Sequence, residues 1–104
     1  MTPPSSVRTT SRFERLARLL LKGHPEFPAL HHRAIEILKA DPYNRSRQHH
    51  IRKLEAVPVG QGQWWLSLVR FRFRYDISGR EVVLEYCGLR RKPLADRWGP
   101  APIT

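Results

Sequence analysis

The stretch Trp64–Arg91 reads WWLSLVRFRFRYDISGREVVLEYCGLRR, and it decides the fold. From Arg70 onward, charged side chains alternate strictly with aromatic or aliphatic ones. The apolar set is Phe71, Phe73, Tyr75 and Ile77, and the charged set is Arg70, Arg72, Arg74 and Asp76. A period of two predicts a half-buried β-strand. Ser78–Arg80 supplies a turn, and Val82–Cys87 is expected to return as the next strand. The predicted hairpin has one apolar face and a row of arginines on the other.

The segments before this hairpin predict a pair of helices that cover its apolar face. Ser11–Glu14 has the pattern of a capping box and begins an amphipathic run, in which Phe13, Leu16, Ala17, Leu20 and Leu21 share one helix face. That helix is expected to end at Gly23. A second helix is expected from Phe27–Pro28 to Asp41–Pro42. Since neither apolar stripe can be buried alone, both helices are expected to pack on the sheet.

Shorter extended segments complete the prediction. Val7–Thr10 is expected to form a short edge strand, and Ile51–Leu54 an extended segment. Trp64–Leu68 is a further strand, and Val69–Arg70 either forms a tight turn or continues one long bent strand. The predicted fold class is therefore α+β, with two N-terminal helices packed on one face of a small antiparallel sheet, in the order β-α-α-β-β-β. Residues 7–97 are expected to form a single domain, between a flexible N-terminus (1–6) and a flexible tail (98–104).

Composition narrows the class of partner. The chain has 104 residues and a formal net charge of +10, carried mostly by arginine. Because arginine forks onto phosphate groups, this surplus favours nucleic acid, and an acidic protein partner fits equally well. The single cysteine, Cys87, excludes an internal disulfide framework and is expected to be a small buried hydrophobe. No apolar run is long enough to cross a bilayer and no secretory signal precedes the domain, so a cytoplasmic protein is expected.

The order of these elements, with the residues that carry it, resembles the RelE/ParE superfamily of toxins from bacterial type II toxin–antitoxin systems. The resemblance covers roughly Val7–Arg97. It rests on the capped first helix, on the second helix ending in Leu38–Pro42, and on Lys53–Leu54 before a glycine-bearing loop. It continues with Phe71–Tyr75 in the place of the family's Tyr-Arg-x-x-Tyr strand, and with the segments Val82–Leu84 and Cys87–Arg91.

The resemblance implies a RelE-like fold and a toxin held inactive by a cognate acidic antitoxin, with a monomeric toxin in that complex. RelE-like members enter the ribosome and cut mRNA without a metal or other cofactor, whereas ParE-like members inhibit DNA gyrase. For the first activity, Arg72 matches the family's strand arginine, and Arg90 matches the arginine just after the last strand. Both are expected to stabilise negative charge on the phosphate that is attacked.

Metal-free RNA cleavage also needs a base for the ribose 2′-OH and an acid for the leaving oxygen. The candidates in this chain are His49, His50 and Glu55. A further set of cations is expected to bind RNA, and it comprises Arg45, Arg47, Arg52, Lys53, Arg70, Arg74, Arg91, Lys92 and Arg97. The alternating arginines also fit the solvated face of an antiparallel sheet, and the basic run Arg45–Lys53 fits a solvated loop.

The chain departs from the family pattern in two places. Trp65 and Ser67 stand where the family has strand lysines, and no tyrosine follows Arg91. These departures leave three readings open: an mRNA endonuclease, a gyrase inhibitor on the same fold, and a toxin that retains only antitoxin binding. A metal site is not expected, because the histidine pairs His31–His32 and His49–His50 are adjacent and do not have the spacing of ligands.

Overall fold

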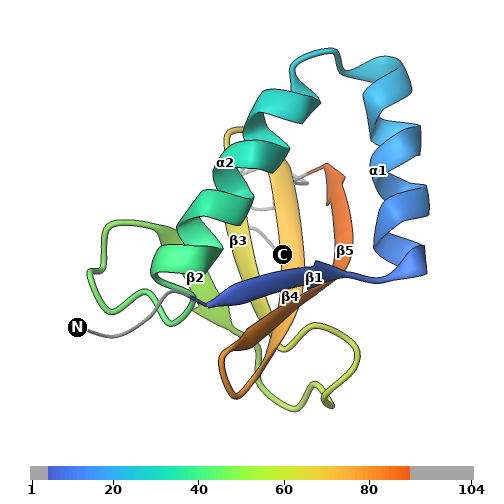
Figure 1. Ribbon diagram of the computed structural model, residues 1–104. Coiled ribbons are helices and arrows are strands. Elements are labelled where there is room, and N and C mark those ends of the chain that lie inside the picture. The colour runs from blue at the N-terminus through green and yellow to red at the C-terminus, as the bar shows by residue number, and fades with distance from the viewer. Residues whose placement is uncertain (1–4, 90–104) are drawn as a thin grey trace, which may run out of the picture.

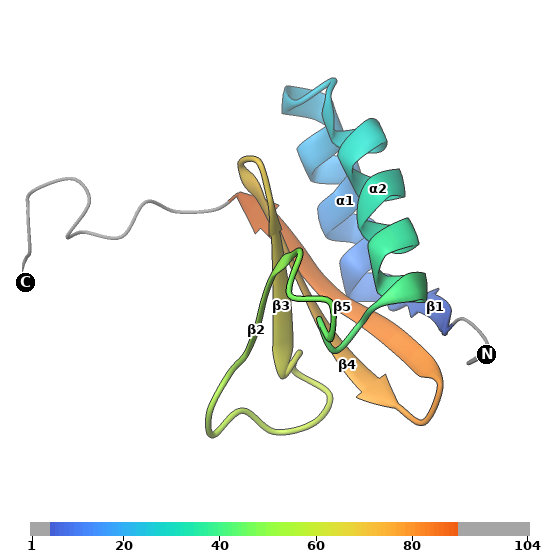
Figure 2. The same cartoon turned by 90° about the vertical axis from the view of Figure 1, so that its left-hand side faces the viewer.

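The computed structural model describes residues 5–89, which form an α+β fold of two helices and a five-stranded sheet (Figure 1). Both helices lie side by side on one face of the sheet (Figure 2). Within residues 5–89, no helix or strand covers the opposite face, which we call the open face. The elements are β1 (Ser6–Thr9), α1 (Ser11–Gly23), α2 (Phe27–Ala40), β2 (His50–Lys53), β3 (Trp64–Leu68), β4 (Phe71–Ser78) and β5 (Glu81–Leu89).

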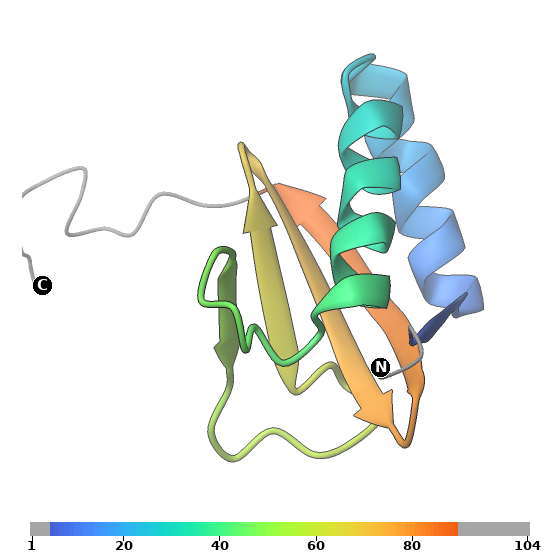
Figure 3. The same cartoon turned by 60° about the vertical axis from the view of Figure 1, so that its left-hand side comes forward.

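The sheet is mixed, with the strand order β1-β5-β4-β3-β2. Its two edges are β1 (blue) and β2 (green), which lie at opposite sides of the sheet (Figure 3). The prediction of an antiparallel sheet in the order β-α-α-β-β-β was wrong in two respects. β1 pairs with β5 in parallel, and the extended segment at Ile51 adds a strand by pairing with β3. A four-residue edge strand carries no local signal of its direction, because its partner lies far along the chain.

The alternation in β4 is confirmed. Phe71, Phe73 and Tyr75 are fully buried under the helices, and the turn at Val69–Arg70 separates β3 from β4. The hairpin turn between β4 and β5 is also confirmed, and Gly79 at its tip has a positive φ of 60°, which a glycine adopts without steric cost. β4 is the centre of the sheet and supplies the core with three aromatic rings.

A β-bulge interrupts the pairing of β4 with β5. Arg74 pairs with Tyr86, but Tyr75 pairs with Leu84, so Glu85 is the extra residue. The bulge changes which side chains face the helices. Val82, Leu84 and Cys87 lie in the core, whereas strict alternation from Leu84 would have placed Tyr86 there. Tyr86 is therefore on the open face.

Helix α1 begins one residue earlier than the capping box predicted. The hydroxyl of Thr10, not Ser11, accepts a hydrogen bond from the Phe13 amide at 3.1 Å, and the Thr10 amide donates to the Leu84 carbonyl of β5 at 3.1 Å. Phe13 is fully buried, and Leu16, Ala17 and Leu20 pack against the core, as predicted. Leu21 is 49% exposed and lies off this face.

Helix α2 begins as predicted, with Pro28 in its first turn, and buries Phe27, Ala34 and Leu38. Beyond its end, the buried Tyr75 hydroxyl donates to the Pro42 carbonyl at 2.8 Å, which ties the following loop to β4.

Neither helix in residues 5–89 combines the length and apolar character that a bilayer crossing requires. Cys87 is buried as expected, and burial raises the pKa of its thiol to about 12.

His31 of α2 lies in an aromatic stack. Its ring is 5.5 Å from Phe27 and 6.4 Å from Phe73, nearly parallel to both, and 5.3 Å from Phe13. Its Nε2 is buried without a hydrogen-bond partner among the described residues. Burial lowers the pKa of His31; His32 acts in the same direction, and Glu14 opposes them. The imidazole is therefore accommodated in its neutral form.

A pH-dependent loss of stability follows from this stack. Because the folded-state pKa of His31 lies below its unfolded value near 6.5, the unfolded chain binds more protons as the pH falls below about 6.5. The free energy of unfolding, measured in urea, should therefore be lower at pH 5 than at pH 7. We expect His31→Phe to remove part of this difference and the exposed-site control His50→Gln to keep it. An equal pH difference in all three proteins would contradict the assignment.

Asp76 points to the open face but is only 3% exposed. Its carboxylate accepts hydrogen bonds from the backbone amides of Gly60 (3.0 Å), Gly62 (3.1 Å) and Gln63 (3.0 Å). The Asp76 carboxylate therefore ties the loop between β2 and β3 to β4 at three amides. Gly62 has a φ of 83°, and a Cβ atom there would lie 2.8 Å from Cβ of Arg74, so the loop requires glycine at this position.

Candidate nucleic-acid interface

Strand pairing places polar side chains in two rows across the open face. The first row runs from β2 to β5 as His50, Ser67, Arg72 and Gly88, and the second as Arg52, Trp65, Arg74 and Tyr86. Directly paired residues share a face of the sheet, and neighbouring strands lie about 4.8 Å apart. Each row therefore crosses the sheet as a line of adjacent side chains, with no helix above it in residues 5–89.

Arg72 is the central cation of this face. Its guanidinium carbon lies 4.4 Å from the ring centroid of Trp65, in a cation–π contact that holds the side chain against the sheet. Its Nε atom is buried and donates to no acceptor among the described residues. The hydroxyl of the neighbouring Ser67, which is 7% exposed, is equally without a partner there. Two polar groups with unused hydrogen-bonding capacity thus lie side by side. Each lowers the free energy of unfolding by about 1–3 kcal/mol if it stays unpaired.

His50 lies in the same row as Arg72. It is exposed at the start of β2 and two strands away, so the two Cα atoms are separated by about 10 Å, with Ser67 between them. An imidazole is the side chain best suited to proton transfer near neutral pH. Of the three acid–base candidates predicted from the sequence, only His50 lies in the same row as Arg72.

Tyr86 lies on the other side of Arg72. Its ring lies over Gly88, the residue paired with Arg72, and a Cβ atom at position 88 would overlap the Tyr86 hydroxyl. The guanidinium of Arg12 is 5.5 Å from the ring centroid and covers part of the ring. Sequence reasoning did not select Tyr86. The bulge at Glu85 puts it on this face, and a bulge has no signal in the alternation of residues.

Glu85 is a second acidic group that the sequence did not indicate. Burial raises its pKa, as do a hydrogen bond with Asp76 and the negative charge of that residue, while Arg8 and Arg12 act in the opposite direction. Asp76 is four residues along β4 from Arg72, which is about 13 Å. Glu85 therefore belongs to a separate part of the face and does not share a phosphate site with Arg72.

Within residues 5–89, no three His, Cys, Asp or Glu side chains gather into a metal-binding group.

Several predicted RNA contacts have other roles or positions. Arg74 donates through Nε and Nη2 to the Gly62 carbonyl at 3.2 and 3.0 Å, so it holds the β2–β3 loop. Arg70 lies in the β3–β4 turn and not on the strand face, and its Nε is 3.8 Å from the Glu26 carboxylate beside the helices. Lys53 lies opposite to Arg52, on the helix side of the sheet, 5.6 Å from the Trp64 ring.

The remaining predicted residues within 5–89 lie on segments away from Arg72. Lys53 is three residues, or about 10 Å, beyond His50 along β2, and Glu55 is in the turn past it. His49, Arg45 and Arg47 belong to the loop between α2 and β2. Of the predicted basic residues that the structure describes, Arg52 alone joins Arg72 and Arg74 on the open face. Four predicted residues lie outside the described part of the chain: Arg90, Arg91, Lys92 and Arg97.

Comparison with known proteins does not extend this picture, since no family model, curated protein or solved structure matches the chain.

Proposed function

We propose that this chain is a RelE/ParE-like toxin whose open face binds RNA and cleaves it without a metal. The fold is compatible with this proposal, because the two helices cover one side of the sheet and the open face carries arginine side chains. The observation that carries it is the Arg72–Ser67 pair: two adjacent buried polar atoms that have no partner among residues 5–89 and lie beside Trp65 on the open face. A phosphate oxygen accepts hydrogen bonds from both a guanidinium and a hydroxyl.

The proposed reaction uses His50 and Arg72 of the first row and Tyr86 of the second. His50 takes the proton of the ribose 2′-OH, and the 2′-oxygen forms a bond to the adjacent phosphorus. Arg72 stabilises the charge that develops on the phosphate oxygens. The bond from phosphorus to the 5′-oxygen breaks, and the Tyr86 hydroxyl gives this oxygen a proton. The products are a 2′,3′-cyclic phosphate and a 5′-hydroxyl, and base and acid lie on opposite sides of the cation, as an in-line displacement requires.

The same proposal includes the partners of a toxin. The surplus of positive charge would dock the chain on ribosomal RNA and mRNA, and an acidic antitoxin would neutralise it in the cytoplasm. Inhibition of DNA gyrase is the second candidate function. It is favoured by Trp65 and Ser67, which stand on β3 where the family's nucleases have lysines.

The proposed roles can be tested by measuring how fast this chain cleaves an mRNA on ribosomes that are programmed with that mRNA. We expect His50→Ala to lower the single-turnover rate by about a hundredfold, because general acid–base groups contribute about 10²–10⁴. Tyr86→Phe, which keeps the ring and removes the hydroxyl, should lower it to a similar extent. His32→Ala, an exposed histidine of α2, is the matched control and should cleave at the wild-type rate. Full activity of both His50→Ala and Tyr86→Phe would refute the proposed roles of these two residues as base and acid.

A further inference from the structure

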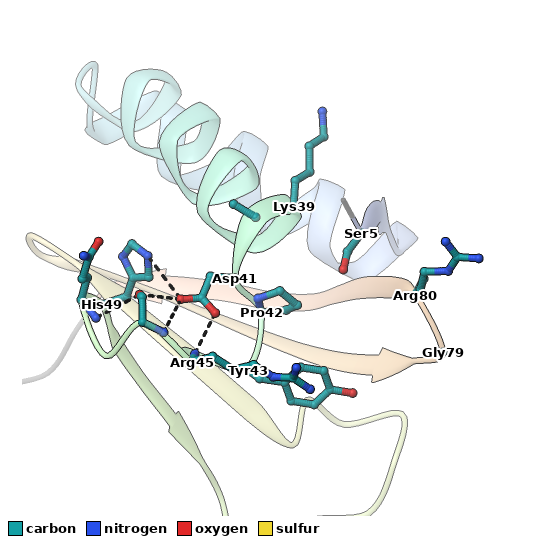
Figure 4. A pocket seen from close by; sticks show the side chains of 12 residues that line it. Ser5, Lys39, Asp41, Pro42, Tyr43, Arg45, His49, Gly79 and Arg80 are labelled. Carbon is teal, nitrogen blue, oxygen red and sulfur yellow. Dashed lines mark hydrogen bonds and ion pairs between the residues drawn. The ribbon is translucent and has the colours of Figure 1, made fainter. Parts of the chain in front are cut away.

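A hollow of about 880 Å³ opens at the carboxyl end of α2 (Figure 4). It lies between the last residues of α2, the loop 41–49 and the turn between β4 and β5. Its volume is within the range of small-molecule sites in proteins, about 300–1,000 Å³. The residues that line it are Ser5, Lys39, Ala40, Asp41, Pro42, Tyr43, Arg45, Ser46, Gln48, His49, Gly79 and Arg80.

The lining has an excess of positive charge. Lys39, Arg45 and Arg80 come from three different elements, and the Lys39 ammonium is also 3.9 Å from the exposed Glu36 carboxylate. Asp41 is the only acidic residue among the described residues that line the hollow. The carboxyl end of α2 adds about half a negative charge, which leaves the lining cationic. The N-terminal segment joins the backbones that carry two of these cations, because the Ser5 amide donates to the Lys39 carbonyl and the Ser6 amide to the Arg80 carbonyl, both at 2.9 Å.

Asp41 organises the loop through its carboxylate. Its carboxylate accepts hydrogen bonds from the Arg45 amide (2.7 Å), the Ser46 amide (3.1 Å) and the Ser46 hydroxyl (2.6 Å). The Nε2 atom of His49 is 3.9 Å from Oδ2 of Asp41. Burial alone would raise the pKa of Asp41, but the hydrogen bonds from Ser46 and Arg45, with the nearby His49, lower it. The dashed lines in Figure 4 show this convergence on one carboxylate.

The loop is therefore a preformed wall. In addition to the Asp41 contacts, the Asn44 side chain pairs with both backbone groups of His49, donating at 2.9 Å and accepting at 3.1 Å. Pro42 is tied to the core through Tyr75. A wall fixed in this way loses little conformational entropy when a ligand binds.

Tyr43 gives the hollow an aromatic surface. Its side chain is 44% exposed, and its ring is held edge-on by Trp64 at 5.4 Å between centroids. The Arg45 guanidinium lies 5.3 Å from the Tyr43 ring centroid. A ring and a guanidinium at this distance offer a stacking surface for a planar base, while Lys39 and Arg80 offer charge for a phosphate.

We propose that this hollow binds a nucleotide, with its base on Tyr43 and Arg45 and its phosphate near Lys39 and Arg80. Two sources fit this chemistry: a free nucleotide, and one nucleotide of an RNA strand that passes the edge strand β2. The adjacent residues His49 and His50 lie in the hollow and on the open face respectively, so this edge is the boundary between the two sites. The proposal does not depend on cleavage at the open face.

Titration of the ¹⁵N-labelled full chain with adenosine 5′-monophosphate tests the site. We expect amide shifts in residues 41–49 and at Gly79–Arg80, and weaker binding of adenosine or inorganic phosphate alone. Tyr43→Ala, and the double variant Arg45→Ala with Arg80→Ala, should each raise the Kd at least about tenfold, since a stacked base or a pair of charged contacts is worth about 1–3 kcal/mol. Arg33→Ala on the exposed side of α2 should leave the Kd unchanged.

A 2′-O-methyl oligoribonucleotide, which resists cleavage by 2′-OH attack, separates the two sources. Equal affinity with the mononucleotide assigns the hollow to a free nucleotide. Much tighter binding, with additional shifts at His50 and Ser67, assigns it to an RNA strand. Absence of shifts in residues 41–49 with both probes, or an unchanged Kd in both the Tyr43 variant and the double variant, would overturn the proposal. The Arg72→Ala variant, which lacks the proposed open-face function, should still bind the mononucleotide. Failure of the nucleotide site and failure of the open-face function are therefore distinguishable.

Discussion

Substitution of Arg72 with alanine is expected to lower RNA cleavage by at least about a hundredfold, because removal of one preorganised donor to a developing oxyanion typically costs about 10²–10³ in rate. Arg72 lies at the centre of the open face, with its guanidinium on Trp65 and its Nε unpaired among the described residues. Growth arrest by the expressed chain should be lost in parallel. Single-turnover cleavage on programmed ribosomes measures the first effect, and colony formation after induction measures the second.

Two companion variants make this prediction specific. Arg72→Lys keeps the positive charge but loses the planar fork and the stack on Trp65, so we expect an intermediate rate. Arg33→Ala removes an exposed arginine from α2 and should behave as wild type. Far-ultraviolet circular dichroism should be unchanged in all three, since the side chain of Arg72 lies outside the core. An Arg72→Ala chain that cleaves RNA normally would remove Arg72 from the reaction.

Asp76→Ala is expected to destabilise the fold by about 3 kcal/mol. The carboxylate satisfies the amides of Gly60, Gly62 and Gln63, and an unpaired buried donor costs about 1–3 kcal/mol. Partial relaxation of the loop lets some of these amides reach water, so the three costs do not add fully. A loss of this size is a large fraction of the 5–15 kcal/mol that stabilises a typical domain. Urea unfolding measures the change.

The matched control is Glu55→Ala, an exposed acidic residue in the same loop, which should change stability by less than about 0.5 kcal/mol. Hydrogen exchange gives an independent signature, since the amides at positions 60, 62 and 63 should lose protection in the Asp76 variant. Equal stability of the two variants would show that Asp76 does not hold the loop.

The sequence predicted those parts of the fold that depend on local periodicity. The alternation along β4 identified the buried faces of Phe71, Phe73 and Tyr75, and the apolar spacing identified both helices. The same alternation placed Arg72 on the face opposite these rings. Each of these inferences requires only that a strand repeats every two residues and a helix every 3.6.

Features that depend on non-local pairing were not predictable. Whether β1 runs parallel to β5 is decided by residues far apart in the chain. The bulge at Glu85 moves Tyr86 to the open face, and the turn at Val69–Arg70 moves Arg70 away from it. Asp76 reads as one more charged residue of the polar face, yet loop amides bury it.

The adjacent histidines show why site membership was only partly predictable. β2 begins at His50, so His50 faces the open side with Ser67, while His49 belongs to the loop that lines the hollow. A prediction of the strand boundary that is wrong by one residue exchanges these roles. The sequence therefore supplied three acid–base candidates, and strand register distinguished among them.

The most direct test of the central claim is to map RNA ends in cells that express this chain alone, within minutes of induction, and to compare wild type with Arg72→Ala. If the open face cleaves RNA, new 5′-hydroxyl ends and 2′,3′-cyclic phosphate ends should appear inside translated frames with the wild-type chain, and the Arg72→Ala chain should produce none. Growth arrest with intact mRNA and altered plasmid supercoiling would contradict this account and assign the chain to gyrase inhibition.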